Sequence, residues 1–266
     1  MFQVIGERIN TSRKKVQAAV ADRNADYIEA DVKMQLDAGA DFIDVNAGAR
    51  IGHEEEDMSW LLDIIGSVTT IPLCLDSPDP GILEMAYAKV DKTPMINSIS
   101  LEKERFDTMM PFLEGKQCNI IALCMDDKGM PSSSGDIFER ASTLISELGA
   151  IGFDPDTIYI DPLVQPISTD ITKGNMVLDA VRQIKTTYRD VHITGGLSNI
   201  SYGLPERRII NRTFVCLMMA AGMDSAIIDP LDTKIMSTIR TADMLLGRDD
   251  FCMNFLKGVR SGTIQS

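Results

Sequence analysis

The chain has 266 residues, of which 26 are basic and 39 acidic, so its formal net charge is −13, and 44% of its residues are hydrophobic. The acidic balance argues against a nucleic-acid surface, and no apolar run approaches the roughly 20 residues that span a bilayer. The first residues lack the charged segment followed by an apolar one that marks a secretion signal. We therefore expect a soluble cytoplasmic protein that binds neither nucleic acid nor membranes.

Short apolar segments alternate with amphipathic segments along the chain. Strands are predicted at residues 2–5, 41–45, 71–75, 94–96, 120–123, 157–160, 191–194 and 225–228. Helices are predicted at residues 25–38, 58–68, 101–113, 137–148, 176–186, 205–221 and 233–246, among others. This alternation without a large insertion predicts an α/β fold, a single (β/α)₈ TIM barrel covering residues 1–266. An open doubly wound sheet is the alternative, but no GxGxxG motif follows a predicted strand.

The cysteines and histidines do not have the spacing of a metal site. The chain contains five cysteines and two histidines, with no CxxC pair and no HExxH motif. The cysteines are Cys74, Cys118, Cys124, Cys216 and Cys252. Most of them lie in apolar stretches, so we expect free thiols in the core and no metal of the protein's own.

Polar residues follow nearly every predicted strand. In chain order they are Glu7 and Asn10, Asn46, Asp76, Asn97, Asp126 and Asp127, Asp161, Ser198 and Asn199, and Asp229. In a barrel the carboxyl ends of the strands converge on one face, where barrel active sites lie. Asp and Asn also cap helices and turns, so capping is the alternative explanation for individual members, Asp229 and the Asp126–Asp127 pair above all. A ring of carboxylates and carboxamides with few cations suits a neutral heterocycle rich in N–H donors, such as a pterin or a purine.

At these positions the chain resembles the pterin-binding methyltransferases. That group includes the methyltetrahydrofolate:corrinoid/iron–sulfur protein methyltransferase, the folate module of cobalamin-dependent methionine synthase, and the tetrahydrofolate methyltransferases of anaerobic demethylation systems. The matching segments are IGERIN at 5–10, DVNAG at 44–48, LCLDS at 73–77, MINS at 95–98, YIDPL at 159–163, GLSN at 196–199 and INRTF at 210–214. Each segment is a weak signal, but the set spans nearly the whole chain in the family's order.

The resemblance implies a (β/α)₈ barrel, usually a homodimer, that holds tetrahydrofolate or 5-methyltetrahydrofolate at the carboxyl ends of its strands. It implies that Asp76, Asn97 and Asp161 bind the amine, the ring N–H and the carbonyl edge of the pterin. Asn199 would lie beside N5, the atom that carries the methyl group, and would be the catalytic residue.

The resemblance implies further substrate contacts around N5 and along the folate. Gly196 and Ser198 would shape the wall at N5, and Arg207 would lie toward the benzoyl or glutamate part. Glu7 and Asn10 would line the floor of the site. Tyr202 departs from the pattern, because the corrinoid/iron–sulfur enzyme has glutamine there and methionine synthases tend to have an aromatic residue.

The chemistry of methyl transfer fits an amide at N5. A neutral amine is a poor leaving group, so N5 must gain positive character, and the carboxamide oxygen of Asn199 can accept a hydrogen bond from N5–H⁺. The chain carries no corrinoid-binding module, so the corrinoid would belong to a separate protein. We expect transfer from a methyl-Co(III) corrinoid protein to tetrahydrofolate in an anaerobic demethylation system. Transfer from methyltetrahydrofolate to the corrinoid/iron–sulfur protein of the acetyl-CoA pathway is the alternative.

Two other functions are compatible with a pterin pocket. A dihydropteroate synthase releases pyrophosphate, which calls for cations and Mg²⁺ ligands. After Ile5 this chain reads GERIN and not that family's Asn-Val-Thr-Pro-Asp-Ser-Phe segment. A folate-binding protein without catalysis would share the same pocket, and only turnover separates it from the methyltransferase.

One predicted loop is unusually long. Residues 126–136 are rich in glycine and serine, a composition typical of a mobile surface segment. Such a loop could move when a corrinoid protein docks, or it could be an ordinary surface loop, and the sequence favours neither.

Overall fold

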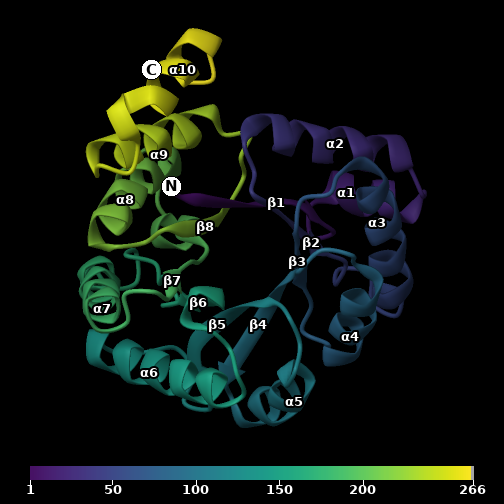
Figure 1. Cartoon of the computed structure of the whole chain (residues 1–266), viewed down its shortest axis with the longest axis horizontal. Coiled ribbons are helices and arrows are strands. Elements are labelled where there is room, and N and C mark those ends of the chain that lie inside the picture. The colour runs from purple at the N-terminus through teal and green to yellow at the C-terminus, as the bar shows by residue number, and fades with distance from the viewer. Residues whose placement is uncertain (265–266) are drawn as a thin grey trace.

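A computed structural model describes residues 1–264, and eight parallel strands occupy its centre (Figure 1). The strands are β1 (Gln3–Asn10), β2 (Phe42–Asn46), β3 (Leu73–Asp76), β4 (Met95–Leu101), β5 (Asn119–Asp126), β6 (Ile158–Asp161), β7 (His192–Ile193) and β8 (Ser225–Ile228). Their spatial order is β7-β6-β5-β4-β3-β2-β1-β8. Backbone hydrogen bonds from Asp224 N to Ile193 O (3.4 Å) and from Ile227 N to Gly195 O (3.3 Å) join β8 to the end of β7. The predicted TIM barrel is confirmed, and each predicted strand overlaps an observed one.

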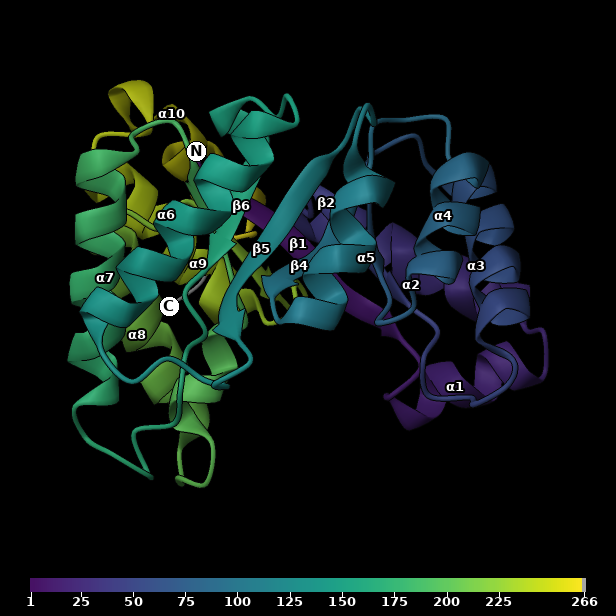
Figure 2. The same cartoon turned by 90° about the horizontal axis from the view of Figure 1, so that it is seen from below.

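Helices connect successive strands and surround the barrel (Figures 1 and 2). They are α1 (Lys14–Ala21), α2 (Ala25–Ala38), α3 (Glu54–Val68), α4 (Pro80–Lys89), α5 (Lys103–Leu113), α6 (Ser134–Ala150), α7 (Lys173–Thr187), α8 (Arg207–Ala221), α9 (Thr233–Leu245) and α10 (Met253–Ser261). Short 3₁₀ turns occur at η1 (Pro155–Thr157), η2 (Leu197–Ser201) and η3 (Asp250–Cys252). Helix α10 lies outside the ring, beside α9. Within residues 1–264, no helix combines the length and the apolar character needed to cross a membrane.

Three helices, α1, α4 and α10, fall outside the predicted ranges, and for α1 and α4 the reason is a short or atypical sequence. Helix α1 has only eight residues, so its apolar periodicity spans barely two turns. Helix α4 begins at Pro80 and is capped by Asp79, whose side chain accepts a hydrogen bond from Gly81 N (2.8 Å). Both signals are local, and neither produces the long apolar stripe by which the other helices were predicted.

The strands form because their apolar runs can be buried on both faces. Strand β2 is buried along its first four residues, which is typical of a parallel strand covered by helices outside and by other strands inside. One side chain from each of β1 to β6 packs into a cluster that fills the barrel interior: Ile5, Phe42, Cys74, Met95, Ile121 and Tyr159. A second, larger cluster packs the outer faces of the strands against the helices. Cys74, Cys118 and Cys124 are buried as expected of core thiols, whereas Cys252 is exposed.

The lengths of β1 and β7 determine the backbone at the carboxyl ends of these two strands. Strand β1 continues to Asn10, so Glu7 lies inside the strand, and the register with β2 shifts between Gly6 and Ile9. Such a bulge re-aims side chains at the end of a strand. Strand β7 has only two residues, and it gives way to Gly195, whose φ of +144° suits glycine alone.

Candidate active site

Polar side chains from β2, β3 and β4 meet at one level of the barrel. The register aligns Asn46 with Asp76 and Asp76 with Asn97. The Nδ2 atom of Asn46 donates a hydrogen bond to Oδ2 of Asp76 (2.8 Å). This contact joins the strand-end residues of β2 and β3 directly.

Asp44 extends this cluster deeper into the barrel. It lies two residues before Asn46 on the same face of β2, and only 2% of its surface is exposed. Its Oδ1 atom has no hydrogen-bond partner among the described residues. Burial, followed by the charge of Asp76, raises the pKa of the Asp44 carboxyl well above its ordinary value, although Cys74 and Asn97 oppose this. A buried carboxyl oxygen without a partner is costly, so Oδ1 calls for a donor supplied from outside the chain.

Asp76 and its loops are positioned by an arginine from helix α5. Burial raises the pKa of the Asp76 carboxyl, while the hydrogen bond from Asn46 and the charge of Arg105 oppose the shift. Arg105 donates to the backbone oxygen of Ser98 through Nε (2.9 Å) and Nη2 (2.6 Å), and to the backbone oxygen of Ser77 through Nη2 (3.1 Å). It also donates to the oxygen of Pro78. One guanidinium therefore fixes the two segments that follow Asp76 and Asn97.

Asp161 ends β6 on the opposite part of the ring. It is 8% exposed, and burial raises the pKa of its carboxyl to about 6 despite a hydrogen bond from Leu163 N to Oδ1 (2.8 Å). A Cβ atom added to Gly195 would lie 2.8 Å from Asp161 Oδ1, so only glycine lets the backbone pass beside this carboxyl. No described residue donates a hydrogen bond to Oδ2, which leaves that oxygen available to a ligand.

The two predicted floor residues have different surroundings. Burial and the charge of Asp229 raise the pKa of the Glu7 carboxyl, against the charge of Arg13. Asn10 accepts a hydrogen bond from Ser12 N at Oδ1 (2.9 Å), which is the turn-forming role named as the alternative for such residues. Asn10 is aligned with Asn46 at the same end of the barrel.

Two strand-end acids, Asp126 and Asp229, are paired with arginines within the chain. Asp229 forms ion pairs with Arg8 (2.9 Å) and Arg13 (3.3 Å). Asp126 pairs with Arg140 (3.0 Å) and accepts a hydrogen bond from Lys128 N (2.9 Å). Both acids make their contacts within the chain, which favours a structural role for them at the ends of β5 and β8.

The segment after β7 forms the open wall of the site. Ser198 and Asn199 are exposed, and the side chain of Tyr202 is 66% exposed. The carboxamide of Asn199 lies beside Gly196, where an added Cβ would be 3.6 Å from Nδ2, and no described residue forms a hydrogen bond with it. The Asn199 amide is thus free to contact a bound molecule.

Arg207, the first residue of α8, holds this wall in place. It donates to the backbone oxygen of Ser198 (2.8 Å) and to Oγ of Ser201 (3.0 Å). Its guanidinium also lies 6.0 Å from the centre of the Tyr202 ring. Within residues 1–264, the side-chain contacts of Arg207 are all with this wall, so its geometry supports a positioning role.

Together these residues form a site that demands hydrogen-bond donors. Four carboxyl groups have raised pKa values, and carboxamides lie between them: the acids are Glu7, Asp44, Asp76 and Asp161. Within residues 1–264 no three His, Cys, Asp or Glu side chains are grouped to hold a metal ion. Sequence reasoning missed Asp44 as a site residue, although its place two residues before Asn46 put it on the same face.

Comparisons with known proteins agree with this chemistry. Residues 6–229 match the family described as "Pterin binding enzyme". The chain is 35% identical over 263 residues to the methylcorrinoid:tetrahydrofolate methyltransferase of Eubacterium limosum, covering 98% of this chain and 97% of that protein. It is 30% identical over 239 residues to the methionine synthase of Mycobacterium tuberculosis, which covers 85% of this chain but only 20% of that longer protein.

Solved structures show the same fold. A dihydropteroate synthase from Xanthomonas albilineans in complex with 7,8-dihydropteroate superposes with a TM-score of 0.69 over 92% of both chains, at 16% identity. A second structure of that enzyme, with 4-aminobenzoic acid, gives a TM-score of 0.68 at 17% identity. At such identity the likeness concerns the barrel and not the reaction.

Proposed function

The chain belongs to the pterin-binding enzyme family, and from this premise we propose that it transfers a methyl group from a methyl-Co(III) corrinoid on a partner protein to N5 of tetrahydrofolate. The identity with the Eubacterium limosum relative over nearly the full length of both chains supports this activity and its direction. We place the reaction in an anaerobic demethylation system, as the resemblance implies. The reverse transfer from methyltetrahydrofolate, as in the acetyl-CoA pathway, uses the same site.

The observation that carries the proposal is the set of buried carboxyls that form no ion pair within residues 1–264. Asp76 and Asp161 would accept hydrogen bonds from the pterin's amine and ring N–H groups, while Asn97 would cover the carbonyl edge. Asp44 lies below them with an unpartnered oxygen, so a donor bound above it would relieve the cost of its burial. The pterin is the donor-rich, neutral heterocycle that such a site requires.

At the open wall, Asn199 would assist the reaction at N5. The N5 lone pair forms a bond to the methyl carbon while the cobalt–carbon bond breaks, and the electron pair of that bond leaves with the corrinoid substrate. N5 thereby becomes positively charged, and Oδ1 of Asn199 would accept a hydrogen bond from N5–H⁺ before the proton passes to solvent. This contact is stronger in the transition state than in the ground state, which is the requirement for catalysis. Gly196, Ser198 and Tyr202 would shape the wall, and Arg207 would keep it in position.

An anaerobic spectroscopic assay tests this function. Purified protein is mixed with methylcobalamin and tetrahydrofolate, and in a second reaction with cob(I)alamin and methyltetrahydrofolate, while the corrinoid spectrum is followed. We expect turnover, and a decrease of about 100-fold in the variant Asn199→Ala with tetrahydrofolate still bound. Gln183→Ala, which removes an exposed carboxamide on α7, is the matched control.

The other outcomes identify the competing functions. Tetrahydrofolate binding without turnover, with free cobalamin and with the corrinoid protein alike, would identify a folate-binding protein without catalysis. Failure to bind tetrahydrofolate would contradict the site itself.

We further propose that the protein is a cytoplasmic homodimer. Large apolar side chains are exposed near the C-terminal end, at Leu245, Phe251 and Met253, and burying them in a second copy would be favourable. Light scattering coupled to gel filtration measures the mass directly. A monomer at micromolar concentration would refute the dimer without affecting the proposed activity.

A further inference from the structure

A charged cavity lies between the N-terminal parts of α8 and α9. Its volume is about 590 Å³, and its lining includes Arg8, Glu206, Arg208, Arg212, Asp229 and Lys234. Glu206 and Arg208 flank Arg207, which donates its hydrogen bonds to the wall of the candidate active site. The cavity is therefore next to the wall that contains Ser198 and Asn199.

The acids of this cavity are mostly satisfied within the chain. Asp229 is paired with Arg8 and Arg13, at 2.9 and 3.3 Å. Asp232, also in the lining, accepts hydrogen bonds from the backbone N–H groups of Lys234 (3.1 Å) and Ile235 (3.2 Å) as the cap of α9. Glu206 is the one lining acid without such a partner among the described residues.

Three cations that line the cavity, in contrast, form no ion pair within residues 1–264. We name Arg208, Arg212 and Lys234 the α8–α9 cation cluster. None of the three has a carboxylate within ion-pair distance among residues 1–264, and the Nε atom of Arg212 donates only to the backbone oxygen of Arg208 (3.2 Å). Arg208 and Arg212 are four residues apart on α8, so their charges lie on the same face and repel each other. Three unpaired cations at one cavity are notable in a chain whose net charge is −13.

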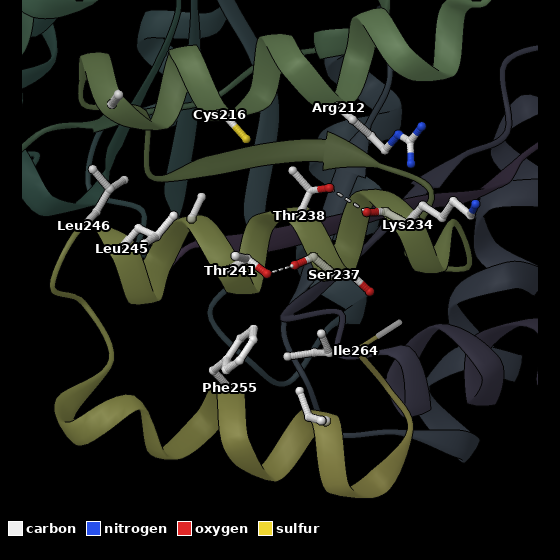
Figure 3. A pocket seen from close by; sticks show the side chains of 13 residues that line it. Arg212, Cys216, Lys234, Ser237, Thr238, Thr241, Leu245, Leu246, Phe255 and Ile264 are labelled. Atoms are coloured by element: carbon white, nitrogen blue, oxygen red, sulfur yellow. Dashed lines mark hydrogen bonds between the residues drawn. The ribbon is translucent and has the colours of Figure 1, made fainter. Parts of the chain in front are cut away.

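A neighbouring groove shows the direction in which the side chains of Arg212 and Lys234 extend. An apolar groove lies between α8, α9 and α10 (Figure 3), and its volume is about 710 Å³. Arg212 from α8 and Lys234 from α9 extend toward the same end of this groove, away from Leu245 and Leu246. Two facing helices thus present their cations at one place.

We propose that the α8–α9 cation cluster binds the γ-linked oligoglutamate tail of the folate substrate. The proposal rests on the proposed function, because it assumes that folate occupies the barrel with its tail directed past Arg207. Each additional glutamate adds one carboxylate, so a tail of several residues carries a row of anions. Arginines one helical turn apart lie about 6 Å from each other along the axis and can contact successive carboxylates.

The test compares folates that differ only in tail length. Dissociation constants of tetrahydrofolate with one and with three glutamates are measured by calorimetry at low ionic strength, without any methyl transfer. We expect the triglutamate to bind about tenfold more tightly than the monoglutamate, a ratio that falls as salt screens the charges. In the double variant Arg208→Gln/Arg212→Gln the ratio should fall close to one.

Two further variants make the test specific. Lys234→Gln tests the cluster from α9 if the α8 variant does not fold, and Arg189→Gln removes an exposed cation between α7 and β7 as the matched control. The control should keep the full ratio. A ratio of one in the unaltered protein, or a ratio that persists in the double variant and in Lys234→Gln, would overturn the proposal.

Failure of this proposal and failure of the methyltransferase activity are read from different measurements. Turnover with the monoglutamate tests the activity, whereas the affinity ratio tests the tail site. If the double variant raises the KM for the corrinoid protein while the affinity ratio is unchanged, the cluster docks a protein and the tail proposal is wrong.

Discussion

Replacing Asp161 with asparagine is expected to stabilise the fold above neutral pH while weakening folate binding. The side chain is buried, and its pKa is raised from 3.8 to about 6, so the folded state holds the proton more tightly than the unfolded chain. The ionised carboxylate therefore opposes folding: its effect is absent below about pH 4, grows as the pH rises, and is complete above about pH 6. The difference between the two pKa values corresponds to about 3 kcal/mol at pH 8 and to about half of that at pH 5.

Asparagine cannot ionise, so it removes this pH dependence of stability without changing the shape of the side chain. Its Oδ1 can still accept the hydrogen bond from Leu163 N, which the aspartate receives at 2.8 Å. Tetrahydrofolate affinity should fall about 10- to 100-fold. The asparagine NH₂ group replaces one carboxylate oxygen and would face an N–H donor of the pterin. The variant should thus gain stability and lose tetrahydrofolate affinity, and this combination distinguishes a ligand-binding carboxyl from a structural one.

Urea unfolding followed by circular dichroism at about pH 5 and about pH 8 measures this difference. The variant should gain stability over the unaltered protein, and the gain should be larger at the higher pH. Asp190→Asn, the same chemical change at an exposed position, should show no such pH-dependent gain. A variant that is no more stable than the unaltered protein at about pH 8 would refute the assignment of Asp161 as a desolvated carboxyl.

Three more perturbations address the same site. Tetrahydrofolate affinity should rise with pH through about 6 and then level off, because the pterin's donors need the ionised Asp161; a flat calorimetric profile would contradict this. Gly195→Ala should lower the free energy of unfolding by about 1–3 kcal/mol, since φ is +144° and the new Cβ would lie 2.8 Å from Asp161 Oδ1; unchanged stability in urea would contradict the close approach. Arg105→Lys should weaken tetrahydrofolate binding about 3- to 10-fold, because lysine cannot bridge the backbone oxygens of Ser77 and Ser98; an unchanged dissociation constant would refute that positioning role.

The barrel could be predicted because its signals are local. Each strand is an apolar run that needs cover on both faces, and most helices carry an apolar stripe long enough to detect. Asp76 and Asp161 could be placed for the same reason, since each ends its strand and barrel strands share one functional face.

Contacts between distant side chains could not be predicted. Nothing in the local sequence marks Arg105 as the group that ties down the turns after β3 and β4. Likewise, the segment 126–136 has the composition of a mobile loop, yet the buried Arg140 holds it by hydrogen bonding to the oxygen of Gly129 (2.6 Å) and by pairing with Asp126 and Asp136. Such anchors depend on side chains that reach backbone atoms of another element, and periodicity carries no information about them.

The shortness of β7 bears on how such a barrel can acquire new chemistry. Strand β6 is matched to β7 by only two residue pairs, whereas β5 and β6 share four. The wall that contains Asn199 follows this short strand. The carboxyls that would accept hydrogen bonds from a ligand lie on strands with longer ladders, such as β2 and β3. An insertion or sequence change in the wall would therefore disturb few hydrogen bonds of the sheet, so the wall can change while the strands that carry the carboxyls are kept. A barrel organised in this way can diverge at the segment after β7 while the ladders of its other strands are kept.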